Sequence, residues 1–229
     1  MKLFHLLFLV MVITVYAVDP SVEQNSNLKI NVVKAEEQIV IDGKLDEKIW
    51  QRPGMTNLIQ QDPDQGLNPS QHSEFWFAYD NEAIYFAGNF YDTRPDSIMA
   101  RLVRRDFIWE DPSDGCVVYI DSSRDKRSGY FFYVSAASTL ADGLIENDVK
   151  QPNDLSWDAV WEGNASLNED GWSAEMKIPY SQLRFQEGNS QIWGINVERF
   201  ISRRFETDML VFTPRNESGF TSRFPDLVG

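Results

Sequence analysis

The chain is poor in the residues that build disulfide frameworks and hydrolytic or zinc centres. Its 229 residues include one cysteine, Cys116, so no disulfide can form within the chain. Two histidines occur, and His5 lies in the apolar N-terminal stretch. The remaining His72 cannot form a zinc site of several histidines, and a Ser-His-Asp triad would have to use it. A Gly-x-Ser-x-Gly elbow and a phosphate-binding loop are also absent from the sequence.

Long hydrophobic runs are absent outside the N-terminus. Residues 1–17 place Lys2 before an apolar stretch and end in Val-Tyr-Ala, a pattern that predicts a secretory signal peptide. The stretch is too short to span a bilayer comfortably, although an N-terminal membrane anchor stays open as the alternative. Residues 18–29 are predicted to be a polar leader. The sequence therefore predicts a protein secreted across the inner membrane.

Positive charge is also scarce. The 21 Lys and Arg residues against 35 Asp and Glu residues leave a formal net charge of -14. A strongly acidic surface repels phosphate backbones, so we expect no nucleic-acid partner. The acidic residues serve solubility in one interpretation and hold structural calcium in another.

Alternating side chains predict strands along most of the chain. In residues 159–167 and 172–178 apolar and polar side chains alternate with period two, and residues 168–171 supply a turn between them. We expect further strands at residues 38–41, 74–79, 83–90, 116–121, 129–136, 192–200 and 208–212. Residues 45–50 are expected to form one helical turn and residues 137–156 a polar loop. The fold class is therefore all-β: a two-sheet antiparallel β-sandwich, immunoglobulin-like or jelly-roll-like, of about nine strands.

Three blocks of sequence carry a resemblance to a known family. They are residues 41–50 (IDGKLDEKIW), residues 118–121 (VYID) with 129–132 (GYFF), and residues 157–161 (WDAVW) continuing to 172–179 (WSAEMKIP). In this order they resemble the family 9 carbohydrate-binding module, over residues 30–228. The match is closest to a subgroup found at the N-terminus of large secreted bacterial proteins with a C-terminal barrel-like domain. The resemblance implies a two-sheet sandwich, a missing covalent C-terminal barrel domain, and a periplasmic, outer-membrane-associated or extracellular location.

The resemblance also implies a sugar site between two aromatic faces. Trp109 and Glu110 occupy the place of the first family tryptophan. Ser222-Arg223-Phe224 matches the stretch after the second, where Phe220 is the nearby aromatic residue. A family carboxylate in the strand after the first tryptophan is replaced by Val117.

Other residues are candidates through their position in the sequence. Trp157 lies at the junction of a loop and a strand, where an indole can touch a ligand. Glu110, Asn216 and Arg223 are candidate polar partners of the sugar, because they lie close in sequence to Trp109 and Phe220. Calcium is a candidate structural cofactor because family members can carry it, and two carboxylate sets stay open. One is Asp121 or Asp125, and the other is Glu110, Asp111 and Asp114; neither has the spacing of an EF-hand.

The sequence thus predicts non-catalytic binding of a poly- or oligosaccharide by a secreted module that targets an attached domain, in the context of carbohydrate catabolism. A structural periplasmic or surface cap of an outer-membrane barrel, without sugar binding, is the alternative. Catalysis is not predicted for the module itself; if it is part of an enzyme, that enzyme would be a glycoside hydrolase acting on O-glycosyl bonds. A haem-binding relative would need ligands such as His72 with Met99, Met176 or Met209.

Overall fold

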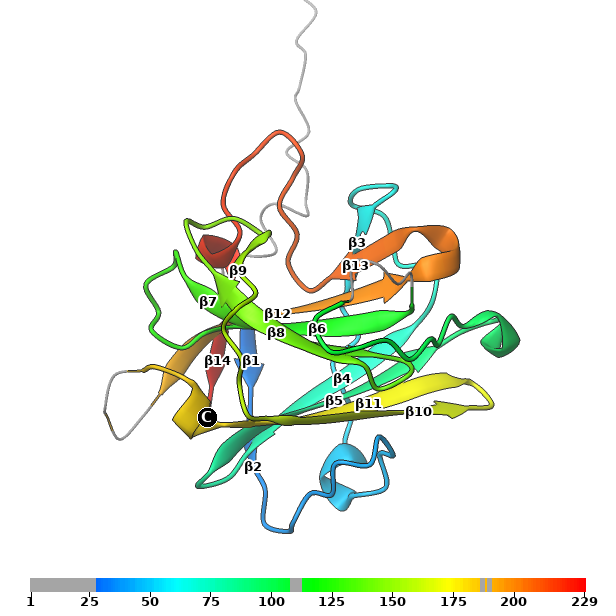
Figure 1. Cartoon of the computed structure of the whole chain (residues 1–229), viewed down its shortest axis with the longest axis horizontal. Coiled ribbons are helices and arrows are strands. Elements are labelled where there is room, and N and C mark those ends of the chain that lie inside the picture. The colour runs from blue at the N-terminus through cyan, green and yellow to red at the C-terminus, as the bar shows by residue number, and fades with distance from the viewer. Residues whose placement is uncertain (1–27, 108–112, 186–187, 189–190) are drawn as a thin grey trace, which may run out of the picture.

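The computed structural model describes residues 28–107, 113–185, 188 and 191–229, so the predicted signal peptide and nearly all of the leader lie outside the described residues. Two sheets face each other, a nine-stranded sheet above and a five-stranded sheet below (Figure 1). The described part of the chain contains no α-helix, only short 3-10 turns, and no helix in it is long and apolar enough to cross a membrane.

The nine-stranded sheet has the order β1-β14-β12-β6-β7-β8-β9, and β13 joins β12 to β3. Its strands are β1 (Lys29–Asn31), β3 (Ile59–Asp62), β6 (Gly115–Asp121), β7 (Gly129–Ser135), β8 (Leu140–Ile145), β9 (Pro152–Asp154), β12 (Ile192–Ile201), β13 (Glu206–Met209) and β14 (Asp226–Val228).

The five-stranded sheet has the order β10-β11-β5-β4-β2. Its strands are β2 (Val33–Lys34), β4 (Ser73–Tyr79), β5 (Ala83–Tyr91), β10 (Glu162–Asn168) and β11 (Gly171–Pro179). The 3-10 turns are η1 (Lys48–Trp50), η2 (Pro95–Ser97), η4 (Tyr180–Gln182), η5 (Ser202–Arg204) and η6 (Thr221–Arg223).

The predicted all-β sandwich is confirmed, with differences in detail. Most neighbouring strands are antiparallel, but β1 pairs with β14 and β2 with β4 in parallel. The predicted loop at residues 137–156 is wrong, because it contains β8 and β9. Asp142 and Gly143 interrupt the apolar pattern of β8. The Asp142 carboxylate is nonetheless buried, where it accepts hydrogen bonds from the backbone N–H of Ala159 and the indole of Trp161.

The predicted strand at residues 38–41 is also wrong. This segment is irregular. Its buried side chain, Ile39, packs with Trp50, Trp76 and Tyr85 on the lower side of the five-stranded sheet. The apolar residue in this segment therefore indicated a side chain buried against the sheet, but the segment has no neighbouring strand to pair with and is not a strand itself.

The core between the sheets follows from the period-two pattern. Alternate residues of β6 and β12, such as Val118 and Val197, face inward against the aromatic side chains of the other sheet. Trp172 is fully buried and stacks on Phe90, with 4.3 Å between the ring centroids. Truncating an aromatic side chain of this kind to alanine typically costs about 3–5 kcal/mol.

Arg199 ties the two sheets together from within. Its side chain projects from β12 and is fully buried, yet it donates to the carbonyl oxygens of His72 (2.8 Å) and Tyr91 (2.7 Å) on the other sheet. A buried guanidinium needs such partners, because an unpaired charge away from water is costly. Burial lowers the pKa of Arg199, and the negative charges of nearby carboxylates, Asp208 foremost, oppose this shift.

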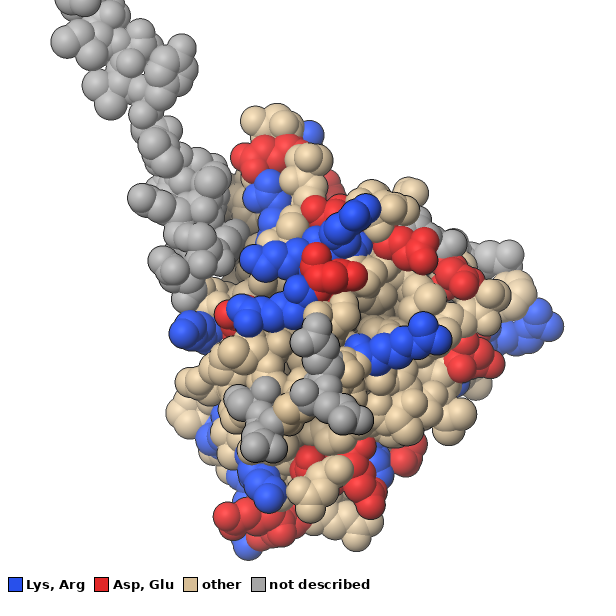
Figure 2. Space-filling model, turned by 90° about the vertical axis from the view of Figure 1, so that its left-hand side faces the viewer, with Lys and Arg blue, Asp and Glu red and all other residues tan. Residues whose placement is uncertain are grey.

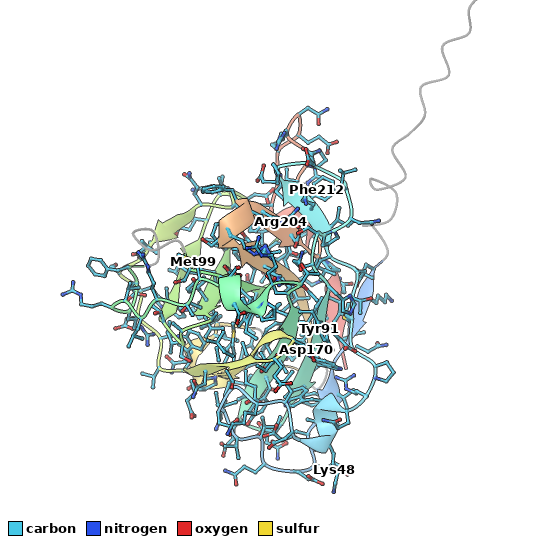
Figure 3. All side chains as sticks on the ribbon, turned by 90° about the vertical axis from the view of Figure 1, so that its right-hand side faces the viewer. Lys48, Tyr91, Met99, Asp170, Arg204 and Phe212 are labelled. Atoms are coloured by element: carbon cyan, nitrogen blue, oxygen red, sulfur yellow. The ribbon has the colours of Figure 1, made fainter. Side chains whose placement is uncertain are left out.

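The outer side of the five-stranded sheet is covered as well, so the polar side chains that alternate along β11 do not mark a solvent-exposed face. Residues 35–50 cross beneath it (Figure 1), and Lys48 marks this segment at the bottom of Figure 3. Glu175 on this side is completely buried. It accepts hydrogen bonds from the Trp50 indole (3.0 Å) and from the backbone N–H groups of Gly43 (3.0 Å) and Asp42 (3.2 Å).

This contact joins two of the sequence blocks that carry the family resemblance. Gly43 has a φ of +81° and lies so close to β10 that a Cβ would come 2.6 Å from the carbonyl carbon of Ala165. Only glycine combines this conformation with so close an approach. The Ile-Asp-Gly block therefore forms a turn whose backbone N–H groups donate to the acidic residue of the Trp-Ser-Ala-Glu block. Both blocks stabilise the fold through this contact.

Candidate functional site

The candidate site lies on the outer face of the nine-stranded sheet. Residues of β6 that alternate with the core positions, Val117 and Tyr119, face away from the sandwich. They join a second apolar cluster that is built largely of aromatic rings. Its buried members are Tyr119, Phe131, Tyr133, Ala141, Ile145, Met209, Phe212, Phe220 and Phe224. Phe212 marks this side at the top of Figure 3, opposite Lys48.

A charged trio stands among these rings. The Tyr119 hydroxyl donates to Glu198 Oε2 at 2.5 Å, and Lys150 Nζ donates to Glu198 Oε1 at 2.9 Å. The Glu198 side chain keeps 11% of its surface exposed and that of Lys150 keeps 39%. Burial, and then the negative charge of Glu198, raise the pKa of Tyr119 well above its usual value, so the phenol stays a hydrogen-bond donor. We call Tyr119, Lys150 and Glu198 the outer-face trio.

The outer-face trio supplies both kinds of hydrogen-bonding charge at one place. A carboxylate oxygen has more than one lone pair, so Glu198 can accept from a ligand hydroxyl while it keeps its protein partners. Lys150 has three N–H donors, of which one is used by Glu198. The trio can therefore bind hydroxyl groups as donor and acceptor.

The register of the sheet explains how a carboxylate comes to lie here. β6 and β12 are antiparallel, and Glu198 is the direct cross-strand partner of Val117. Directly opposed residues project to the same face of a sheet about 5 Å apart. The carboxylate that the resemblance places at position 117 is thus present on the neighbouring strand. Sequence reasoning missed Glu198 because the pairing of β6 with β12 is a long-range contact.

The residues predicted as the first sugar platform, Trp109 and Glu110, lie outside the described residues. The described chain before them is anchored at the start of β8, where the backbone N–H of Asp106 donates to the carbonyl of Leu140 at 3.1 Å. Phe107 keeps 41% of its surface exposed, with the Arg104 guanidinium 4.4 Å from its ring centroid. Phe107 is an exposed aromatic residue beside the predicted platform that sequence reasoning did not single out.

Phe220 has a different place from the one expected of a stacking platform. The ring is only 4% exposed, and it packs edge-on against Tyr119 and Phe224, each with 5.0 Å between centroids. Its two ring neighbours and its burial leave no open face for a sugar. Phe220 instead covers part of the aromatic cluster beneath it, which is a correction to its predicted role.

Arg223 closes its own loop. It donates to Glu217 Oε2 at 2.5 Å and to the carbonyl oxygens of Ser218 and Gly219 at 3.0 and 3.1 Å. Asn216 in the same loop is exposed. The loop is held in turn by Asp148, which accepts hydrogen bonds from the backbone N–H groups of Phe220 and Ser222.

Trp157 lies at the rim of the core. Its ring packs on Tyr130 and Phe132, with centroid distances of 5.0 and 6.1 Å. It is half-buried, so one part of the indole stays open to solvent. The next residue, Asp158, forms an ion pair with Arg105 at 3.1 Å, which places Trp157 near the start of the segment that carries Trp109.

Of the carboxylates considered for calcium, Asp121 and Asp125 cap turns, whereas Glu110 and Asp111 lie outside the described residues. Asp121 accepts from the backbone N–H of Lys126 and the hydroxyl of Ser123, and burial raises its pKa. Asp125 accepts from the N–H groups of Arg127 and Ser128. Within the described residues, no group of three or more acidic, histidine or cysteine side chains is placed to hold a metal ion. Structural calcium therefore stays a prediction.

The structure separates the residues of the haem alternative. Met176 belongs to the core between the sheets and Met209 to the cluster on the outer face. His72 is exposed, with its ring against Tyr91. These described side chains do not converge on one cavity.

Comparison with known proteins identifies the fold. No family model matches the sequence, and no curated protein matches it. Among solved structures, the family 9 carbohydrate-binding module of Caldicellulosiruptor kristjanssonii in complex with cellotriose aligns at a TM-score of 0.62 and 17% identity, covering 88% of this chain and 93% of that chain. The same module with glucose aligns at 0.61 and 17% identity over 88% and 95% of the two chains.

A third structure, of a proposed carbohydrate-binding protein from Bacteroides uniformis, aligns at a TM-score of 0.65 and 15% identity, covering 89% of this chain and 99% of that chain. At these identities the likeness concerns the backbone architecture. The chain thus has the β-sandwich fold of family 9 carbohydrate-binding modules.

Proposed function

We propose that the protein binds a neutral saccharide non-catalytically on the outer face of its nine-stranded sheet. The observation that carries this proposal is the position of Glu198. It stands directly across from Val117, the position at which the resembling family has a carboxylate, and it has Lys150 as its charged partner.

The chemistry of the outer-face trio suits a sugar. A sugar ring offers hydroxyl groups that both donate and accept, and Glu198 and Lys150 supply the matching acceptor and donors. A sugar also has an apolar C–H face, for which a flat aromatic ring provides area at small cost in side-chain entropy. Trp109, with the exposed Phe107 two residues before it, is the candidate for this ring.

The structures with a similar fold support the class of ligand, since they were solved with cellotriose and glucose. We extend this class to the present chain and expect a glucose-based or xylose-based oligosaccharide. Through such binding the module would keep an attached catalytic domain near its polysaccharide by raising its effective concentration. Secretion by residues 1–17 and a covalent C-terminal domain are parts of this proposal.

The test is calorimetric titration of the protein with cello- and xylo-oligosaccharides, beside Glu198→Gln and Trp109→Ala variants. The glutamine keeps the acceptor for Tyr119 but loses the charge, so we expect a folded protein with at least about tenfold weaker binding. Glu162→Gln is the matched control, because Glu162 pairs with Lys177 across β10 and β11 at 3.9 Å on the other sheet. It should bind like the original.

Equal loss in the Glu198 and Glu162 variants, or none in either, would remove the outer-face trio from the site. Absence of binding heat with every saccharide would contradict the proposed function as a whole. The chain would then be better explained as a structural cap.

A further inference from the structure

A cavity opens between the two sheets at one end of the sandwich. Its volume is about 410 Å³, which falls in the range of small-molecule pockets. Tyr79 and Ile84 line it from the five-stranded sheet, and Trp193 and Leu227 from the nine-stranded sheet. The turn between β4 and β5, η4 and the C-terminal end gather at this side, at the left of Figure 1. Figure 2 views this side, where uncharged side chains make up much of the middle.

Aromatic rings form one wall of the cavity. Tyr180, Phe185 and Trp193 pack against one another, with centroid distances of 6.0, 5.9 and 5.4 Å among the three pairs. The Tyr180 hydroxyl also donates to the carbonyl oxygen of Asp80 at 3.1 Å. The rings thus hold one another in place, and a ligand that lies against them has little side-chain entropy to remove. Tyr79 adds a fourth ring.

The polar groups of the cavity call for a hydrogen-bonding ligand. Trp193 is 5% exposed, and its indole N–H has no hydrogen-bond partner in the described part of the chain. This nitrogen is closed to solvent, so Trp193 contributes ring area, and no hydrogen-bond donor, to the cavity wall. Asn81 and Gln191 bring amide groups to the same cavity, and no Lys or Arg is among its described lining residues.

The one carboxylate of the lining is already engaged. Asp80 Oδ1 accepts from the backbone N–H groups of Glu82 and Ala83, and Oδ2 accepts from the Tyr85 hydroxyl at 2.8 Å. These bonds fix the β4–β5 turn, and they lower the pKa of Asp80 against the opposing effect of its burial. Asp80 is therefore a support of the cavity wall, while the exposed Asn81 brings its amide group to the cavity.

We propose that this cavity is a second ligand site, which binds one neutral polyhydroxylated ring. The ring would place its C–H face against Tyr180 and Phe185 and exchange hydrogen bonds with the Asn81 amide, and Trp193 would add ring area to the wall beside it. An anion would find no basic partner among the described lining residues. A quaternary organic cation could use the aromatic wall, but it has no group that exchanges hydrogen bonds with the Asn81 amide.

The site stands apart from the one under Proposed function. Trp193 faces the interior and Glu198 the outer face of the same strand, β12. Each site can therefore be removed while the other is kept.

The experiment is a titration of the full chain, with ¹⁵N-labelled tryptophan, by D-glucose up to about 100 mM. The indole signal that Trp193→Phe removes belongs to Trp193, and we expect it to shift saturably. Asn81→Ala, at an exposed turn position, should weaken this response by about fivefold, the loss expected for one neutral hydrogen bond.

Trp172→Phe is the matched control. Trp172 also has a buried indole N–H without a partner in the described part of the chain, but it stacks on Phe90 in the core and does not line the cavity. Its signal should stay still, and its replacement should leave the Trp193 response unchanged. Glu198→Gln should leave it unchanged as well, whatever it does to oligosaccharide binding.

Three results would overturn the proposal. They are the absence of a saturable Trp193 shift with glucose, a shift of equal affinity in Asn81→Ala, and a shift with tetramethylammonium in place of glucose. The last would assign the cavity to an organic cation.

Discussion

Two glutamates on outward-facing strand positions have opposite surroundings. Glu175, beneath the five-stranded sheet, is completely buried and receives three neutral N–H donors from residues 42–50. Glu198, above the nine-stranded sheet, keeps part of its surface open and is paired with a cation, Lys150. One sheet is sealed by a crossing segment, whereas the other leaves a charged group within reach of solvent. The comparison separates a carboxylate that holds the fold from one that can meet a ligand.

Removing the carboxylate should therefore cost far more at Glu175 than at Glu198. Glu175→Ala leaves the Trp50 indole and two backbone N–H groups without an acceptor, and we expect a loss of at least about 3 kcal/mol in the free energy of unfolding. Glu198→Ala should lose less, about 1–2 kcal/mol, because the half-exposed Lys150 can turn to water and only the Tyr119 hydroxyl is left without its acceptor. Urea unfolding measures both, with Glu169→Ala in the exposed turn between β10 and β11 as the control. Equal losses at the two sites would end the distinction.

The buried carboxylate should also make stability depend on pH. Burial, and then the charge of Glu47, raise the pKa of Glu175 from 4.5 to about 8. Burial and Glu206 similarly raise the pKa of Asp208 from 3.8 to about 7. The folded state then binds more protons than the unfolded state between about pH 4 and pH 8. The free energy of unfolding should therefore fall as the pH rises through this window, by at least about 2 kcal/mol between pH 5 and pH 8.

Chemical unfolding at a series of pH values checks this slope. Glu175→Gln keeps an acceptor and cannot titrate, so its profile should be flatter than that of the original protein. The slope that is left should belong to Asp208. A stability that rises from pH 5 to pH 8 would contradict the assignment, because it would require Glu175 to be ionised in the folded state.

An effect of similar size is expected at the hydroxyl of Tyr119. Tyr119→Phe removes the donor to the Glu198 carboxylate and should cost about 1.5–3 kcal/mol, the range for a hydrogen bond to a charged group. Tyr180→Phe removes a hydroxyl that donates to a neutral carbonyl, and it should cost about 1 kcal/mol. Thermal unfolding of the two variants compares them directly. A smaller loss at Tyr119 would mean that Glu198 is satisfied by solvent.

The smallest change in stability is expected at Lys150. It is 39% exposed, so Lys150→Ala should alter the free energy of unfolding by less than about 1 kcal/mol. Its effect on saccharide affinity should exceed its effect on stability, because a ligand loses a donor. Calorimetry and urea unfolding of the same preparation separate the two quantities, and Lys177→Ala on the other sheet is the control. A loss of stability without a loss of affinity would make Lys150 a purely structural partner.

Much of the fold could be predicted from the sequence because alternation is a local property. Strands β4, β5, β6, β7, β11 and β12 were expected within one or two residues of their observed bounds. β8 was missed because Asp142 looks like a loop residue until its partners, Ala159 and Trp161, are in place. The short strands β1, β2 and β14 were missed as well. Two or three residues carry almost no periodicity, and these strands exist because a neighbour completes their hydrogen bonds.

The candidate site was predictable only in part. Its region near the segment of Trp109 followed from the family resemblance, whereas Glu198 depends on a pairing between distant strands. Phe220 shows the same limit in the other direction. An aromatic residue in a polar loop suggests an exposed platform, but its ring is buried against Tyr119 and Phe224.

By itself the sequence determined an all-β chain, the inward and outward sides of its longest strands, and the glycine turn at Gly43, since these follow from neighbouring residues. The tertiary structure alone decided which outward side is sealed and which stays open. Glu175 lies between Ala174 and Met176 and Glu198 between Val197 and Arg199, so both are single carboxylates in similar strand patterns. Their difference comes from the groups that lie over each side chain. Residues 35–50 cover Glu175, whereas Lys150 and the aromatic cluster surround Glu198. Such contacts depend on packing between distant segments, which no local pattern encodes.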